Sequence, residues 1–228
     1  MSEGESWGTA TVNLRISGER FQARFRVPSG PTLPVRLLPA FQALADSIVG
    51  IAVERVEREG ERISCKKGCG ACCRQVVPVS HTEARHLREL IDALPEPRRE
   101  IVQKRFDSAS RRVRESGLLP SLESLGTLSA EQRRRIGLDY FRLAIPCPFL
   151  EDEACSIHAD RPISCREYLV TSPPADCANP SAETVRRVEV AGAVSSALAG
   201  LDRSPSRRSA GWLPLTLAPA WAREHPEG

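Results

Sequence analysis

Two runs near the N-terminus alternate apolar and polar residues with a period of two. The apolar members are Val12, Leu14 and Ile16 in the first run and Phe21, Ala23, Phe25 and Val27 in the second. The sequence Ser-Gly-Glu-Arg at 17–20 separates the runs, and together they predict a β-hairpin. Because an isolated hairpin is marginally stable in water, we expect its apolar face to pack on the rest of the chain.

Most of the remaining chain shows the spacing of amphipathic helices, and several of these helices begin with a capping signal. Ser80 with Glu83 and Ser129 with Gln132 are capping boxes, and Asn179 before Pro180 is a predicted N-cap. The predicted helices run from Leu37 to about Val56, from Ser80 to about Leu94, over 96–116, from Ser129 to about Leu143, and from Asn179 to about Ala199. The pattern therefore predicts a mainly α fold with an N-terminal β-hairpin.

Breaks in the pattern divide the chain into three parts. We expect a hairpin extension at 1–34, a helical domain at 35–200, and a linker with a C-terminal tail at 201–228. The tail contains the apolar sequence WLPLTLAPAW, which we expect to add one short strand to the N-terminal hairpin.

Composition and charge limit the cellular location and the kinds of partner that we expect. Of 228 residues, 41% are hydrophobic and 27% charged, as in soluble globular proteins, and no run approaches the roughly 20 apolar residues of a membrane helix. The N-terminal residues show no secretory signal, so we expect a cytoplasmic protein without a membrane partner. The formal net charge of +3 and 5% aromatic content argue against a nucleic-acid partner and leave a protein partner open.

Eight cysteines form two groups of four. The first group is Cys65, Cys69, Cys72 and Cys73, and the second is Cys147, Cys155, Cys165 and Cys177. In a reducing cytoplasm, so dense a pattern favours metal binding over a disulfide framework or a set of small buried residues. We therefore predict all eight as metal ligands.

The geometry of the first group depends on the conformation of residues 65–73. A helix would place Cys65, Cys69 and Cys72 on one face, whereas Gly68 and Gly70 favour a loop that metal ligation organises. In either case the side chain of Cys73 diverges from that of Cys72. Cys73 is then a ligand to a second ion, a bridging thiolate or a buried apolar residue.

Other polar side chains near the cysteines have several possible roles. His158 is a candidate nitrogen ligand or a partly buried turn residue, and His81 and His86 are expected at the surface. Arg161 and Arg166 are candidates to offset the negative charge of the thiolates or to hold an anionic substrate. Tyr168 either donates a hydrogen bond to a ligating sulfur or packs in the core.

The two cysteine motifs together resemble a known family. The pattern C-x3-C-x2-C-C at 65–73, followed by CPFL at 147–150 and C-x-I-H-x-x-R-P-x-x-C-R-x-Y at 155–168, is similar to that of the YkgJ-type cysteine-cluster family. That family is described as a zinc- or iron-chelating domain, and its pattern also occurs in flagellin lysine methylases. The resemblance covers about residues 60–170 and implies metal binding, without a settled reaction.

Thiolate ligands suit zinc or an iron-sulfur cluster. The spacing of Cys65, Cys69 and Cys72 also matches the cluster motif of radical S-adenosylmethionine enzymes, but Ala71 replaces their usual aromatic residue and helices follow where a β/α barrel would be needed. We expect a protein that holds zinc or iron, as an ion or an iron-sulfur cluster. The alternative is an iron-dependent enzyme, such as a protein-modifying enzyme or methyltransferase, although no catalytic residue can be named and no common catalytic motif is present.

Overall fold

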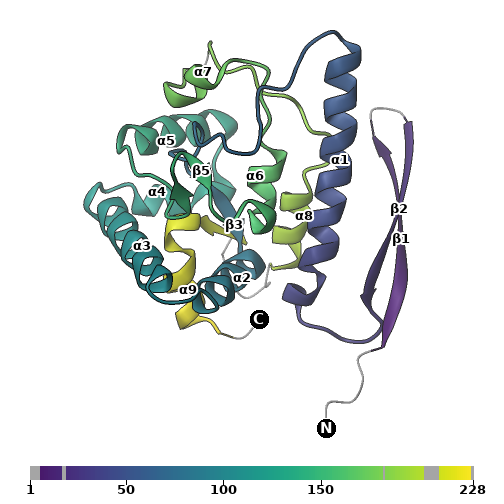
Figure 1. The fold of residues 1–228 in the computed structure, drawn as a ribbon, viewed down its shortest axis with the longest axis horizontal. Coiled ribbons are helices and arrows are strands. Elements are labelled where there is room, and N and C mark those ends of the chain that lie inside the picture. Colours follow the sequence, from purple (N-terminus) through teal and green to yellow (C-terminus); the bar gives the residue numbers. More distant parts are fainter. Residues whose placement is uncertain (1–5, 17–18, 182, 203–210, 227–228) are drawn as a thin grey trace.

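Helices form most of the chain, and a long β-hairpin stands beside them (Figure 1). The computed structural model describes residues 6–16, 19–181, 183–202 and 211–226. The strands are β1 (Trp7–Ile16), β2 (Glu19–Pro28), β3 (Pro78–Ser80), β4 (Leu150–Glu151), β5 (Ala154–Cys155) and β6 (Trp212–Pro214). The helices are α1 (Leu38–Arg58), α2 (His81–Asp92), α3 (Arg98–Glu115), α4 (Leu119–Glu123), α5 (Ala130–Arg142), α6 (Ile163–Glu167), α7 (Pro174–Ala178), α8 (Val194–Leu201) and α9 (Ala218–Glu224), with 3-10 turns η1 (Pro34–Leu37), η2 (Leu125–Thr127), η3 (His158–Asp160) and η4 (Leu215–Leu217). The predicted fold class, mainly α with an N-terminal hairpin, is confirmed.

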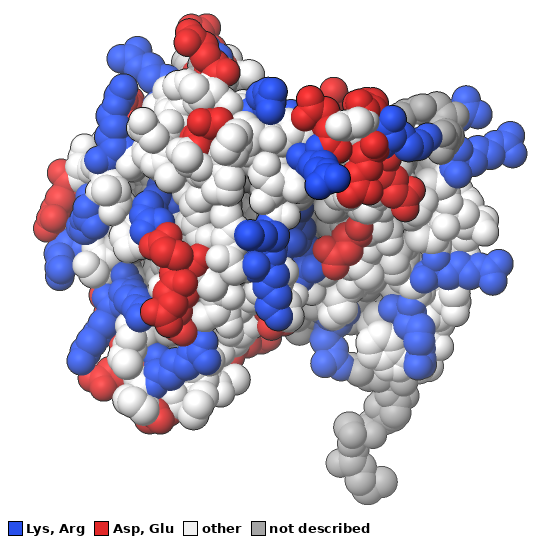
Figure 2. Space-filling view, turned by 45° about the horizontal axis from the view of Figure 1, so that its top comes forward, with Lys and Arg blue, Asp and Glu red and all other residues white. Residues whose placement is uncertain are grey.

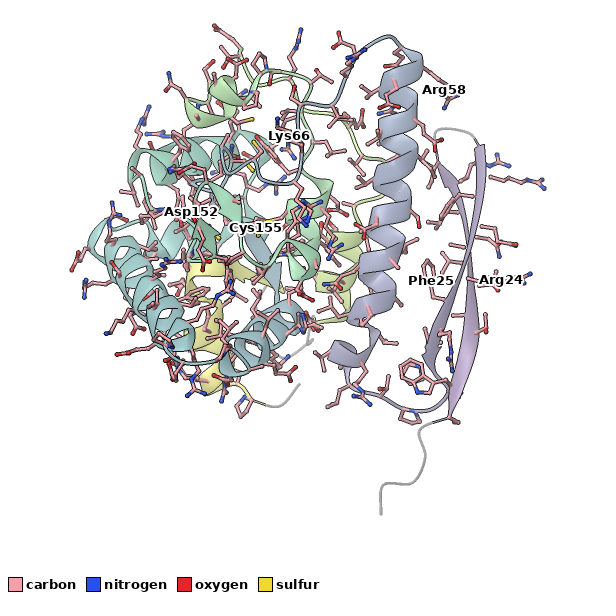
Figure 3. All side chains as sticks on the ribbon, viewed as in Figure 1. Arg24, Phe25, Arg58, Lys66, Asp152 and Cys155 are labelled. Carbon is pink, nitrogen blue, oxygen red and sulfur yellow. The ribbon has the colours of Figure 1, made fainter. Side chains whose placement is uncertain are left out.

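The hairpin packs its apolar face on α1, as its alternation predicts. β1 and β2 pair antiparallel over their whole length, with Leu14 opposite Phe21 and Ala10 opposite Phe25. Ile16 is only 6% exposed, and Phe21 packs with it in a cluster that includes residues of α1. Phe25 points toward α1 whereas its neighbour Arg24 points away from the body (Figure 3).

Helix α1 lies between the hairpin and the rest of the molecule (Figure 1). Its buried residues, Leu38, Ala45, Ile48, Ala52 and Val56, recur at helical spacing. Ile48 shares a cluster with Ile163 of α6 and Leu198 of α8. The side chains of α1 are thus covered by the hairpin on one side and by α6 and α8 on the other.

The segment Pro34–Arg58 is also long and apolar enough to cross a membrane, with a mean hydropathy of 1.4 over its best window. This corrects the expectation that no part of the chain comes near those values. Length and composition are weak evidence by themselves, because a core helix of a soluble protein passes the same test.

The largest core cluster joins the middle of the chain to residues 212–222. β3 pairs antiparallel with β6, so Val79 lies opposite Leu213, and α9 packs against α2. Val79, Leu87, Phe149 and Ala218 are all nearly inaccessible to solvent in this cluster. The prediction that the segment at 212–221 pairs with the N-terminal hairpin is therefore wrong, because its strand β6 pairs with β3 instead.

The capping boxes are confirmed, but the last predicted helix is wrong over most of its length. Both boxes form as expected at the starts of α2 and α5. Residues 179–193 are not helical where the structure describes them, and residue 182 lies outside the described residues. Instead, the backbone of Thr171 donates to Arg186 O and that of Val188 donates to Leu169 O. Gly192, with φ of 77°, then turns the chain into α8.

Candidate metal centre

The first cysteine group lies on a loop of tight turns, not on a helix. The backbone N–H of Cys69 donates to Lys66 O at 3.1 Å, and that of Cys73 donates to Gly70 O at 2.9 Å. Gly68 has φ of 88°, a conformation that a residue with a side chain rarely adopts. Of the two geometries that the sequence allows, the structure therefore has the loop.

Both ends of this loop are bonded to the region of the second cysteine group. The backbone N–H of Ser64 donates to Val170 O at 2.9 Å, and its hydroxyl donates to Thr171 O at 3.1 Å. At the other end, the backbone N–H of Cys147 donates to Cys73 O at 2.7 Å. These bonds bring two segments that are more than 70 residues apart to one place.

The turn between β4 and β5 presses against the middle of the loop. A Cβ atom added to Gly70 would lie 2.5 Å from Glu153 O and 2.6 Å from Leu150 Cδ1. Beside this contact, Arg74 donates two hydrogen bonds to the carboxylate of Glu153, at 2.6 and 3.0 Å. The close approach therefore requires glycine at position 70, and it places Cys155 of β5 near the first group (Figure 3).

Replacing Gly70 by alanine is expected to lower the free energy of unfolding by about 1–3 kcal/mol, because the new methyl group meets backbone that cannot move freely. Urea denaturation of the purified protein measures this change. Gly137→Ala is the matched control, since a Cβ atom there meets nothing within 4 Å and lies in helix α5. The control should be neutral or more stable by about 0.5–1 kcal/mol. Equal losses in both variants would contradict the role given to Gly70.

Cys165 lies on α6, and buried polar contacts hold this short helix. Arg166 is 7% exposed and donates to both carboxylate oxygens of Asp46 on α1, at 3.0 and 2.7 Å. The guanidinium also donates to Arg161 O and Ala159 O. Its contacts are thus to α1 and to the preceding turn, which corresponds to neither of the roles predicted for Arg166.

All eight cysteines are free thiols. Cys177 is buried, and the other seven are half-buried. No disulfide framework is present, so every sulfur remains available as a thiolate ligand.

The adjacent thiols of Cys72 and Cys73 interact directly. A hydrogen bond from the Cys73 thiol lowers the pKa of Cys72 to about 7. The same contact raises the pKa of Cys73, and burial raises it further. Loss of a proton from one thiol of this pair therefore opposes its loss from the other.

Charge interactions show which thiols lie near one another. A negative charge on Cys72 raises the pKa of six other thiols, those of Cys65, Cys73, Cys147, Cys155, Cys165 and Cys177. Cys69 also raises the pKa of Cys65 and Cys177. Cys147 raises the pKa of Cys73 and Cys165, and Cys155 raises that of Cys147. The fold thus brings both cysteine groups together around Cys72.

The pKa of Cys177 is raised by the charges of Cys72, Cys65 and Cys69, whereas that of Cys73 is raised by the charges of Cys72, Cys147 and Cys165. Cys177 lies on α7, between the two bridged residues Val170 and Arg187. Sequence spacing alone could not reveal which thiols are neighbours of Cys177, because this depends on how the second segment folds back.

Arg161 supplies the positive charge beside the thiols. Its guanidinium lowers the pKa of Cys65, Cys72 and Cys155, although burial dominates for Cys65 and Cys155 and raises their pKa overall. Its Nε is buried and has no hydrogen-bond partner among the described residues. An unpartnered buried N–H next to thiols fits the charge-compensating role predicted for Arg161.

The structure gives the nearby histidines and Tyr168 other partners. Arg161 donates to His158 Nε2 at 2.7 Å, so that nitrogen is occupied, and the pKa of His158 is lowered by burial first and by Arg161 next. The Tyr168 hydroxyl accepts a hydrogen bond from Gln75 at 3.2 Å. His81 is 8% exposed and stacks on Trp221, so its expected surface position is wrong.

In the described part of the chain, no group of three His, Cys, Asp or Glu side chains has the geometry of a formed metal site. The donor set itself, eight thiols with one neighbouring guanidinium, fits a soft divalent ion or an iron-sulfur cluster.

A mainly helical domain with thiols gathered at one place defines a cysteine-cluster protein, and comparison with known families agrees. Residues 64–183 match the model of the CxxCxxCC family, described as "Putative zinc- or iron-chelating domain". The match spans just over half of the chain and includes all eight cysteines, and the chain belongs to this family. No curated protein and no solved structure matches the chain.

Proposed function

We propose that the protein holds two metal centres of four thiolates each. Cys65, Cys69, Cys72 and Cys177 would form the first centre, and Cys73, Cys147, Cys155 and Cys165 the second. The observation that carries this is a pair of backbone contacts that join the two cysteine groups: Ser64 N donates to Val170 O, and Cys147 N donates to Cys73 O. The second contact supports assigning Cys73 to the second centre, and the effect of Cys65 and Cys69 on the pKa of Cys177 supports assigning Cys177 to the first. The lowered pKa of Cys72 favours its thiolate as a ligand.

Four thiolates suit tetrahedral zinc or a cluster of iron and sulfide. With eight thiols divided between two centres, every position of a tetrahedral ion is filled. Closed sites of this kind are structural, whereas a catalytic ion keeps one position for water or substrate. We therefore favour a structural or metal-handling role over an iron-dependent modifying enzyme. A reducing compartment such as the cytoplasm would keep thiolate ligands available for metal.

Elemental analysis of anaerobically purified protein, with an absorption spectrum of the same sample, tests this proposal. Two zinc ions per chain in a colourless protein would support two closed structural centres. A brown protein with iron and acid-labile sulfide would support clusters held by the same thiols. Protein that contains neither metal, and that takes up none when thiols are kept reduced, would refute it.

A further inference from the structure

The outward face of the hairpin carries a row of arginines. Pairing places Arg15 opposite Arg20, Thr11 opposite Arg24 and Thr9 opposite Arg26. Asn13 and Gln22 complete this face, and a hydrogen bond of 2.8 Å between them shows that their side chains share it. The opposite face is the apolar one that packs on α1. We call the exposed set Arg15, Arg20, Arg24 and Arg26 the arginine face.

No acidic side chain among the described residues neutralises the arginine face. All four side chains are exposed, and none forms an ion pair with an acidic residue among those that the structure describes. Arg15 and Arg20 stand directly opposite each other, and like charges in that position destabilise a hairpin. The repulsion between Arg15 and Arg20 therefore destabilises the hairpin, and no contact among the described residues offsets it.

The fold separates charges that nearly cancel in the whole chain. The net charge of +3 is an average over 32 basic and 29 acidic residues. Figure 2 shows basic side chains projecting from the right-hand edge, the side of the hairpin, without acidic ones between them. A near-balanced total therefore does not describe the field that a partner would meet at the hairpin.

We propose that the arginine face binds the sugar-phosphate backbone of nucleic acid without reading its bases. Arginine is suited to bidentate phosphate contacts, and hydroxyl and amide side chains between the arginines add donors of the kind that contact phosphates. A protein interface would instead be expected to centre on buried apolar and aromatic anchors. The aromatic residue of this face is Trp7, which lies at its end. The guanidinium carbon of Arg26 is 5.8 Å from the centroid of the Trp7 ring.

The dimensions of the arginine face agree with a short stretch of backbone. Arg20 and Arg26 are six residues apart on one strand, which is about 20 Å at ~3.3 Å per residue. That length corresponds to roughly six base pairs at ~3.4 Å of rise per strand charge. Four neutralised phosphates predict a slope of about −3.6 for log K against log salt on duplex DNA. Raising salt from 50 to 200 mM would then weaken binding about 100-fold.

The experiment measures binding of the full chain to a 20-base-pair duplex and to a single strand of the same length, by fluorescence anisotropy at several salt concentrations. The variant Arg15→Gln/Arg20→Gln/Arg24→Gln/Arg26→Gln should bind at least tenfold more weakly at 50 mM salt and lose most of the salt slope. The fourfold arginine-to-lysine variant should keep the slope, because it keeps the charge. Unchanged binding by the glutamine variant, or no binding by the wild type at 50 mM salt, would overturn the proposal.

A matched control removes four charges elsewhere. Arg111, Arg114, Arg134 and Arg135 are exposed on α3 and α5, so their replacement by glutamine alters the net charge equally. This control should weaken binding less than twofold, and a loss equal to that of the hairpin variant would overturn the assignment to the arginine face. Polyglutamate is the second probe. Binding of polyglutamate as tight as that of DNA, and lost in the hairpin variant, would overturn the choice of nucleic acid and indicate an acidic protein surface.

Discussion

Changing Cys72 to serine is expected to remove the metal of the first centre and to weaken the second. The thiol of Cys72 has a pKa of about 7 and interacts with six other thiols, so its loss removes the ligand that is ionised most readily. Ligand loss also costs folding free energy, because zinc binding by thiolate sites is worth on the order of 10 kcal/mol. Metal content per chain, measured with the midpoint of thermal unfolding, should fall below half of the wild-type value together with stability.

Single-cysteine variants of the two centres separate two sites from one shared site. Cys69→Ser should lose the first centre and Cys155→Ser the second, so each should retain about half of the metal. A single cluster held by all the thiols would lose its metal in every variant. His158→Ala is the control and should keep nearly full metal content, because Arg161 already occupies its Nε2. Full metal content in the Cys69 and Cys72 variants would refute the ligand assignment.

Replacing Glu83 by alanine is expected to destabilise the fold by about 3–5 kcal/mol. One carboxylate oxygen accepts from Ser80 N at 2.9 Å, and the other accepts from Ile163 N at 2.7 Å. Glu83 is 2% exposed, so its removal leaves buried donors unsatisfied at the starts of both α2 and α6. Urea denaturation measures the loss. Because α6 carries Cys165, metal affinity should fall in the same variant.

The second capping box supplies the control for Glu83. Gln132 closes an equivalent box with Ser129 at the start of α5, but this box is exposed. Gln132→Ala should cost only about 1 kcal/mol, since water can satisfy the freed groups. Similar losses at Glu83 and Gln132 would show that burial and the bond to Ile163 add nothing.

Burial also raises the pKa of Glu83, despite the hydrogen bonds that lower it. A raised pKa in the folded state means that the fold binds this proton more tightly than the unfolded chain does. The contribution of the group to stability is therefore full below the ordinary carboxyl pKa and declines as pH rises through the raised value. Glu83→Gln cannot ionise, so its deficit relative to the wild type should shrink as pH rises over that interval.

Local sequence patterns predicted most of the helices and strands of this fold. They could not predict which distant segments pair with each other. The period-two alternation around Val12 and Phe25 and the capping box at Ser80 each act within a few residues, where sequence neighbours decide the structure. The pairing of β3 with β6 and the bridge between Val170 and Arg187 depend on partners outside the local sequence. An N-cap and a proline at 179–180 were not enough to form a helix against that competition.

The same distinction applies to the metal centre. The density and spacing of the cysteines predicted a metal site, because few other functions explain eight cysteines in two groups. The proposed division into two centres was not available from spacing, because it depends on how residues 147–177 fold over the loop. The sequence predicted the capping box that Glu83 forms with Ser80. It gave no indication that Glu83 also accepts a hydrogen bond from Ile163 N.

The pairing of β3 with β6 has a consequence for how the protein is made. Core residues around Val79 are completed only by Leu213, Leu215 and Ala218. At ribosomal rates of about 5–20 residues per second, the roughly 150 residues between the first cysteine loop and α9 take about 8–30 s to synthesise. During that interval the core around Val79, against which Cys147 and Cys155 pack, is incomplete. The first cysteine loop is therefore synthesised well before the core that supports the second cysteine group.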